Sequence, residues 1–365
     1  MTKWRLEPRA SSSIFFSAAI TSASLCAALV AGGVLMTLMK VNPLVSYSEI
    51  LRGALGSGYG FSETLVKAIP ITLTGLACLF SFKMMIWNIG AEGQLVMGAL
   101  ASAAVVRYFY FDSHVAMFIL MFAASAISGG VWGAIPGFLK GRWAVNEIIA
   151  TLMLNYIALY TMDFMLYGAW KDPMSMGFPM TAPFPDSARL WRFGNTRVHA
   201  GIVIAVIVSF LAWIVMRWTQ WGFEIRVIGE SQRAARYFGM SIMRNILLVM
   251  FVSGAIAGIC GFGEVAGLQG RLSRGFAVGY GFTGVIVAWL ARLNPLAVPL
   301  VAFLMGILLV GGDTLQVVMA LPLSSVQMIQ GMILFSILGG ELFSKYRLRR
   351  VGAAGRSDVP TEGAV

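Results

Sequence analysis

Residues Ile14 to Met39 form an apolar run without one charged side chain, and similar runs recur along the chain. About 20 apolar residues are enough for an α-helix to cross the hydrocarbon core of a bilayer. The chain is 58% hydrophobic and 12% charged, about half the charged fraction of a soluble globular domain. The sequence therefore predicts an integral membrane protein. Because no small-residue cleavage site closes the first run, we expect it to be retained as an anchor helix.

Nine further apolar segments follow the first. Prolines, glycines and polar residues interrupt several of them, and backbone groups freed in this way must find partners inside the protein. The predicted fold is all-α, with about ten transmembrane helices, some of them broken near the membrane midplane. The transmembrane domain would be residues 14–341, preceded by an N-terminal tail, 1–13, and followed by a C-terminal tail, 342–365. The nine segments are 65–82, 84–106, 115–138, 147–168, 199–216, 245–263, 277–291, 296–318 and 323–341.

The basic residues are unevenly distributed. The chain has 27 Lys and Arg against 16 Asp and Glu, and most of the basic ones fall on one side of a ten-span topology. Since Lys and Arg are enriched in cytoplasmic segments, both termini are predicted to be cytoplasmic. This bias accounts for most of the net charge of +11 without a nucleic-acid partner.

Three connections are long enough to have a role. The outer segment 40–64 predicts a short amphipathic helix at the membrane interface, and the proline-rich outer segment 169–198 predicts an irregular cap. The inner loop 217–244 contains a short basic helix, with Ser231 as its N-cap and Gly239 as the residue that ends it. Such a helix suits a groove on a cytoplasmic partner, although a solvated connector is an equally good interpretation.

Polar residues interrupt three of the predicted spans. Asn88, Glu92 and Gln94 lie close together between two apolar runs, where they could line a cavity or join helices by hydrogen bonds. Glu147 and Asn155 share a face of the fifth span, with the same two interpretations. Tyr280 and Phe282 belong to a glycine-rich break in the eighth. Asp163, Glu264 and Asp313 are closer to predicted ends, where they can be interfacial.

Glycines recur every four residues in two predicted spans. This spacing places them on one helix face and predicts close helix packing. Gly129, Gly133 and Gly137 form one such row; Gly254 and Gly258 form the other.

Sequence features of an enzyme are missing. The 3 cysteines and 2 histidines do not have the spacing of a metal site. The dipeptide Gly-Lys does not occur, so the chain has no phosphate-binding loop of the kind found in ATPases. We therefore expect no enzymatic activity, metal or cofactor in this chain.

Four segments resemble the permeases of ATP-binding cassette (ABC) importers in the branched-chain amino acid, ribose and nucleoside group. Residues 87–94, WNIGAEGQ, resemble the FNIGxEGQ segment of this group. Residues 146–156, NEIIATLMLNY, are similar to NEVIxTxMLNY. Residues 222–239 resemble the coupling segment, and residues 279–295 look like GYGFxGIAVALLGxxxP. The matches occur in the expected order between residues 40 and 340.

The combination looks most like the nucleoside-uptake branch, whose receptors are lipoproteins of the basic-membrane-protein type. Two positions depart from the group's pattern. Trp87 stands where Phe is usual, and Trp289 lies in a segment where small residues are usual. Both positions lie in segments near the expected substrate path, so they affect which substrate the resemblance implies.

The resemblance implies an importer permease of the type II kind in the bacterial inner membrane. The expected partners are ABC ATPase subunits that bind ATP and Mg²⁺, a second homologous permease, and a periplasmic or lipid-anchored substrate-binding protein. The implied substrate path comprises Asn88, Glu92, Gln94, Glu147, Asn155, Tyr280 and Phe282. The implied ATPase contact comprises Gly229, Glu230, Arg233, Ala234, Ala235, Arg236 and Gly239.

Two alternatives remain at this point. Broken helices and intramembrane carboxylates also occur in ion-coupled secondary transporters, where Glu92 would be the ion-binding carboxylate. The substrate could also be a simple sugar such as ribose.

Overall fold

The computed structural model describes residues 3–8 and 14–351 and divides the chain into two compact units. The larger unit is Ile50–Gly311, and the smaller joins the described residues before it to those after it. Two helices, α2 (Pro43–Leu55) and α12 (Val298–Val318), cross the boundary between the units.

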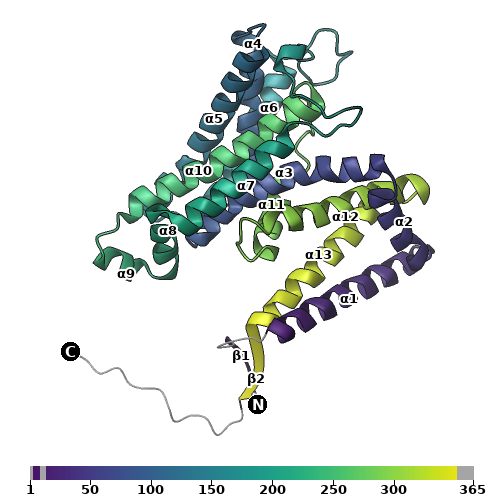
Figure 1. Cartoon of the computed structure of the whole chain (residues 1–365), viewed down its shortest axis with the longest axis vertical. Helices are drawn as coiled ribbons and strands as arrows, with labels where there is room; N and C mark the ends of the chain where they lie inside the picture. The colour runs from purple at the N-terminus through teal and green to yellow at the C-terminus, as the bar shows by residue number, and fades with distance from the viewer. Residues whose placement is uncertain (1–2, 9–13, 352–365) are drawn as a thin grey trace. The chain divides into compact units, whose positions relative to one another are not determined.

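In the smaller unit, α1 (Ile14–Leu38) packs along α13 (Leu323–Lys345), as Figure 1 shows. The strands β1 (Lys3–Pro8) and β2 (Tyr346–Val351) pair antiparallel, with Lys3 opposite Val351. The all-helical prediction therefore holds for the rest of the described chain but missed this pair of terminal strands.

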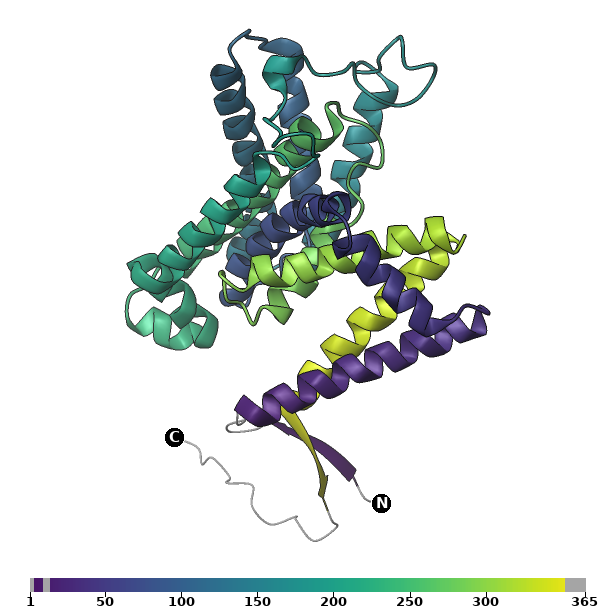
Figure 2. The same ribbon diagram turned by 45° about the vertical axis from the view of Figure 1, so that its right-hand side comes forward.

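In the larger unit, α10 packs against α3, α4 and α5, and α11 packs against α3. Figure 2 shows the irregular segment that follows α6 at one end of α7 and the short helix α9 at the other. The elements of this unit are α3 (Gly58–Lys83), α4 (Ala91–Tyr108), α5 (His114–Trp143), α6 (Glu147–Tyr167), η1 (Asp186–Ala188), α7 (Gly201–Trp218), α8 (Gln220–Glu230), α9 (Gln232–Tyr237), α10 (Ile242–Phe262), the π-helix η2 (Gly263–Gln269) and α11 (Tyr280–Leu290).

The two predicted glycine rows meet each other where α5 crosses α10. A Cβ atom on Gly254 would collide with the backbone oxygen of Gly129, and one on Gly129 would collide with that of Gly254. A Cβ atom on Gly98 of α4 would collide with the backbone of Gly258. Small residues let helix backbones approach this closely, so the glycines set the distances between α4, α5 and α10.

All ten predicted apolar segments contain a helix, but the number of membrane crossings differs. Six of the described helices are both long and apolar enough to cross a membrane: α3, α5, α6, α7, α10 extended by η2, and α12. A seventh candidate is the pair Cys26–Leu38 and Pro43–Leu55, which is bent by 113°. Helix α11 is apolar but shorter. The predicted count of about ten spans is therefore not confirmed.

Two boundaries differ from the prediction for local reasons. Helix α3 begins at Gly58, seven residues early, because the Ser57 side chain accepts the backbone N–H of Gly60 and caps it. The second boundary is the C-terminal end of α10, where the helix continues into the π-helix η2. Glu264 consequently lies inside the packed unit, 1% exposed. Its interpretation as an interfacial residue stays a prediction.

Candidate functional site

The connection between α3 and α4, Met84–Gly90, is a non-helical stretch that we call the polar turn. Asn88 is fully buried within it and uses both ends of its amide. Its Nδ2 donates to Gln94 Oε1 at 3.0 Å and to Ser253 Oγ at 2.8 Å. Its Oδ1 accepts from the Gly90 backbone N–H and from Gln94 Nε2. These bonds fix the broken backbone that the sequence predicts here and join it to α10.

Glu92, in the first turn of α4, binds the start of α11. Its Oε1 accepts the backbone N–H of Gly279 at 2.9 Å, and its Oε2 accepts that of Gly281 at 2.6 Å. A carboxylate at a helix N-terminus satisfies free N–H groups and complements the helix dipole. Since Glu92 is 3% exposed, it joins two helix starts inside the protein.

Asn155 of α6 forms hydrogen bonds to the backbone on both sides of the start of α4. Its Oδ1 accepts the Gly93 backbone N–H at 2.8 Å, and its Nδ2 donates to the Ile89 carbonyl at 2.8 Å. The predicted stripe of α6 that contains Glu147, Thr151 and Asn155 is buried. Its members bond to other groups of the protein, as expected if the stripe joins helices rather than lines a cavity.

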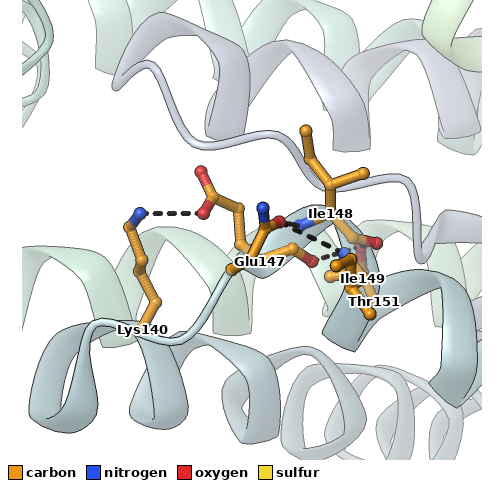
Figure 3. Close-up of polar contacts among 6 residues, drawn as sticks. Lys140, Glu147, Ile148, Ile149 and Thr151 are labelled. Atoms are coloured by element: carbon orange, nitrogen blue, oxygen red, sulfur yellow. Dashed lines mark hydrogen bonds and ion pairs between the residues drawn. The ribbon is translucent and has the colours of Figure 1, made fainter.

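Glu147 lies at the start of α6, beside the end of α5 (Figure 3). Its carboxylate pairs with Lys140 Nζ at 2.8 Å, while Thr151 Oγ1 donates to its backbone carbonyl. The preceding residue, Asn146, caps the helix by accepting the backbone N–H groups of Ile148 and Ile149. The structure thus places Glu147 at the first residue of α6, where its ion pair joins this helix to the end of α5.

The break before α11 brings Tyr280 and Phe282 together in sequence but not in environment. Tyr280 is 3% exposed, and Thr74 Oγ1 donates to its backbone carbonyl at 2.9 Å. Phe282 is 45% exposed. Of the seven residues predicted for the substrate path, Phe282 presents the most surface. The other six are buried: Asn88, Glu92, Gln94, Glu147, Asn155 and Tyr280.

The inner loop has the predicted capping geometry. Ser231 Oγ accepts the Ala234 backbone N–H at 3.2 Å and caps α9, and Gly239 follows the helix with φ of +73°. Gly229 packs on the end of α3, where a Cβ atom would collide with the Lys83 carbonyl. Ala235 is fully buried, and Ala234 is half-buried. Outward lie the exposed residues Glu230, Arg233 and Arg236.

Two aromatic residues at the end of α9 escaped the sequence analysis. Tyr237 is 89% exposed and Phe238 is 71% exposed, with ring centroids 5.9 Å apart. Phe238 also lines a groove of about 680 Å³ between α8 and the start of α10, together with Met240 and Leu248. Large exposed aromatics beside a groove are typical of a protein interface. The mixed aromatic and arginine composition of the loop could have suggested them.

The irregular segment 168–200, which precedes α7, is joined by backbone hydrogen bonds to the π-helix η2 and to the residues after it. Backbone bonds join Leu190 to Ala266, Phe184 to Gly270 and Thr181 to Leu272. The predicted cap is thus held by a run of backbone hydrogen bonds rather than by regular secondary structure.

Charged and polar groups lie where this cap meets α3 and the start of α7. Arg197 pairs with Glu63 of α3 at 3.0 Å. His199 is fully buried, and its Nδ1 accepts the Gly201 backbone N–H at 3.1 Å. Burial, together with the charge of Arg192, lowers the pKa of His199 to about 4, so its ring is neutral at pH 7. Within the described part of the chain, both carboxylate oxygens of Glu264 lack a hydrogen-bond partner.

The two tryptophans that depart from the family pattern contact each other. The rings of Trp87 and Trp289 stack with centroids 5.5 Å apart and planes at 28°, and both also lie against Phe82. The polar turn is thereby packed against the end of α11, a second contact between the segments that Glu92 joins.

No group suited to a metal ion is found among residues 3–8 and 14–351, where three or more His, Cys, Asp or Glu never converge.

The chain is similar in sequence to known transport proteins. Residues 60–338 match the family model described as branched-chain amino acid transport system / permease component. This chain is 34% identical to the glucose ABC transporter permease protein TsgB13 of Haloferax volcanii, over 98% of this chain and 97% of that protein. It is 32% identical to the guanosine ABC transporter permease protein NupP of Bacillus subtilis, over 88% and 92%. A second guanosine permease of that strain, NupQ, is 24% identical over 64% and 75%.

Proposed function

Since this chain belongs to the family of branched-chain amino acid transport system permease components, we propose that it is the membrane subunit of an ABC importer for nucleosides. In this proposal the chain forms half of the substrate path. ATP is hydrolysed on separate ATPase subunits, and a substrate-binding protein delivers the nucleoside from outside. The chain lies in the bacterial inner membrane with both termini in the cytoplasm and about ten membrane crossings.

The observation that carries the proposal is the exposed tip of α9. A loop that only connected α8 to α10 would have no need of two aromatic rings, 89% and 71% exposed, beside Arg233 and Arg236. Aromatic and arginine side chains supply most of the binding energy at protein interfaces. Movement of a partner bound at this tip would be transmitted to α3, because both α8 and α9 are capped and Gly229 packs on the end of α3.

The proposed partner at this tip is an ABC ATPase subunit. The proposed second permease follows from the two guanosine permeases of Bacillus subtilis, NupP and NupQ, which are both similar to this chain. We therefore expect a heterodimer of two homologous permeases.

The ion-coupled alternative required Glu92 to be available to an ion. Both of its carboxylate oxygens accept backbone N–H groups at the start of α11 instead. An ion would have to replace two charge-assisted hydrogen bonds, which are among the stronger ones in proteins. This arrangement favours a structural role for Glu92 and the ATP-driven mechanism.

For the substrate, nucleosides and simple sugars are the two candidates, since the relatives are named for guanosine and for glucose. We favour nucleosides because two guanosine permeases, NupP and NupQ, are similar to this chain, although the identity to the glucose permease is slightly higher, at 34% against 32% for NupP. Uptake of labelled guanosine and of labelled glucose by the native host, with and without this chain, discriminates between them.

Purification of the tagged chain from the native host in mild detergent tests the partner proposal. Co-purification of a P-loop ATPase and a second permease is expected. The matched variants are Ala234→Glu, at a half-buried position of α9, and Asp112→Asn in the loop between α4 and α5. The first should release the ATPase and the second should not. Isolation of the chain alone, in several detergents, would contradict the proposal.

A further inference from the structure

One face of the outer half of α6 carries three phenols and a carboxylate. Tyr156, Tyr160, Asp163 and Tyr167 follow one another at intervals of four, three and four residues, the spacing of a single helix face. The neighbouring face packs inward, with Asn155, Met162 and Leu166 buried. Tyr156 is 51% exposed and Tyr160 is 69% exposed.

Arg274, in the loop before α11, reaches over this face. Its Nε lies 3.4 Å from Asp163 Oδ1, and its Nη1 donates to the Tyr167 hydroxyl at 3.1 Å. The guanidinium also lies over the Tyr167 ring, 5.9 Å from the centroid. The pairing with Asp163 is longer than a well-formed charge-assisted hydrogen bond, so the carboxylate is only loosely held.

Beside this ion pair lies a half-open pocket of about 340 Å³, large enough for a molecule of nucleoside size. Its walls include Tyr156, Tyr160, Asp163, Arg274 and Ala277. An ion pair facing lipid would be costly, so this face meets water or protein rather than acyl chains. The pair balances its own charge, which suits a neutral polar ligand better than a phosphorylated one.

We propose that this pocket binds the transported nucleoside on the outer part of its path. The phenol rings of Tyr156 and Tyr160 stack on the base, and the Asp163 carboxylate accepts hydrogen bonds from the ribose hydroxyls. Arg274 pairs loosely with the carboxylate and supplies donors to the exocyclic carbonyl oxygen of the base. This inference rests on the proposed function and adds a binding site to it.

The choice of groups follows from the chemistry of the ligand. Aromatic faces stack on bases irrespective of sequence, and each stacked base contributes measurably to binding. A carboxylate has two oxygens that can accept from neighbouring hydroxyls, and hydrogen bonds to a charged group are the stronger kind. Sugars share the hydroxyls but lack the base, so the two parts of the pocket can be tested separately.

The test measures initial uptake of labelled guanosine, 2′-deoxyguanosine and glucose in the native host, with the gene replaced by each variant. The receptor is the same in every strain, so a change in the ratio of substrates reports on this chain. We expect wild type to prefer guanosine over 2′-deoxyguanosine about tenfold, and Asp163→Asn to reduce that preference to less than twofold. Tyr160→Ala should lower uptake of both nucleosides about tenfold.

Phe164→Ala is the matched control for Tyr160→Ala. Phe164 is exposed on the same half of α6 but does not line the pocket, so its removal should leave uptake within twofold of wild type. Tyr160→Phe, which keeps the ring and loses only the hydroxyl, should retain most of the uptake. The amount of each variant in the membrane is measured by immunoblot, and uptake is expressed per molecule.

Three results would overturn the site. One is a wild-type ratio near one, and another is an unchanged ratio in Asp163→Asn. The third is full recovery of uptake and ratio in the charge-swapped double variant Asp163→Arg and Arg274→Asp, which would make the pair purely structural.

Failure of the proposed substrate is distinguishable from failure of the site. If wild type takes up glucose and not guanosine, the nucleoside function is wrong. The site is then decided by the ratio of glucose to 2-deoxyglucose in the same variants, with loss of the preference in Asp163→Asn supporting it and no change rejecting it.

Discussion

Trp87 stacks on Trp289, with ring centroids 5.5 Å apart, although one residue lies near the beginning of the larger unit in sequence and the other near its end. Each departs from the family pattern toward a larger side chain. Since the two rings stack on each other, they concern the packing of the polar turn on α11 rather than two independent features of the substrate path.

Replacing either tryptophan should lower stability, and replacing both should cost less than the sum. We expect a coupling of about 0.5–1.5 kcal/mol between Trp87→Ala and Trp289→Ala, the usual value for an aromatic pair. Midpoints of thermal unfolding in detergent measure the cycle. Trp87→Ala combined with Phe210→Ala on α7 should be additive, and equal coupling in both cycles would refute the packing argument.

Glu92→Gln should destabilise the protein. A glutamine side chain can accept one of the two backbone N–H groups of α11 but presents donors to the other, so about 1–3 kcal/mol should be lost. Asp186→Asn is the control, because its pairing with Arg189 is at the surface and contributes little. Abolished uptake with an unchanged melting midpoint would instead restore Glu92 as an ion-binding carboxylate.

Gly258→Ala should disrupt the contact between α5 and α10, since the new Cβ atom would collide with the Ser125 carbonyl. Overpacking of this kind costs about 1–3 kcal/mol. Gly58→Ala places the same methyl group in open space at the start of α3 and should be neutral or stabilising. Comparable losses in both variants, measured by thermal unfolding, would show that the close approach is not what matters.

The burial of His199 predicts a loss of stability in acid. Its pKa is about 4 in the folded protein and about 6.5 when exposed, so the unfolded chain binds the extra proton. Stability from this group is complete above pH 6.5 and is lost as the pH falls toward 4, by about 3 kcal/mol in all.

His199→Asn isolates that contribution from the carboxylates that also titrate in acid. The asparagine oxygen can still accept the Gly201 N–H, but the side chain does not titrate. Unfolding midpoints measured from pH 7 to pH 4 should fall less steeply in the variant. Parallel curves would mean that His199 is protonated in the folded protein.

Replacing Tyr237 and Phe238 by Ala should abolish uptake without unfolding the protein. Substitutions at such exposed positions usually change stability by less than about 0.5 kcal/mol. The double variant Tyr110→Ala and Phe111→Ala, also exposed but in the loop between α4 and α5, is the control and should keep uptake. Normal uptake and ATPase retention in the first double variant would exclude α9 as the coupling element.

Features set by neighbouring residues were predictable from the sequence. Ser231 and Gly239 mark the ends of α9 because capping depends on a few consecutive residues. The glycine rows at 129–137 and 254–258 identified both sides of a helix contact, although spacing alone did not indicate that they meet each other. The helical segments themselves followed from the apolar runs.

Features set by distant partners were not predictable. Glu92 and Asn155 were correctly picked out as unusual, but their roles depend on backbone N–H groups that lie 187 and 62 residues away. The same holds for Asp163, whose partner Arg274 lies in a loop more than a hundred residues later in the chain. The sequence identifies polar residues in apolar helices, whereas only the fold says whether their partner is the protein or a ligand.

The glycine contacts of α10 also limit how this protein can move. Sliding of one packed helix over another is normally absorbed by side chains that change rotamer. Where backbone touches backbone at Gly98, Gly129, Gly254 and Gly258, there are no side chains to adjust. Helices α4, α5 and α10 therefore form a rigid frame that is displaced only as a whole, and any opening and closing of a path must take place around this frame rather than within it.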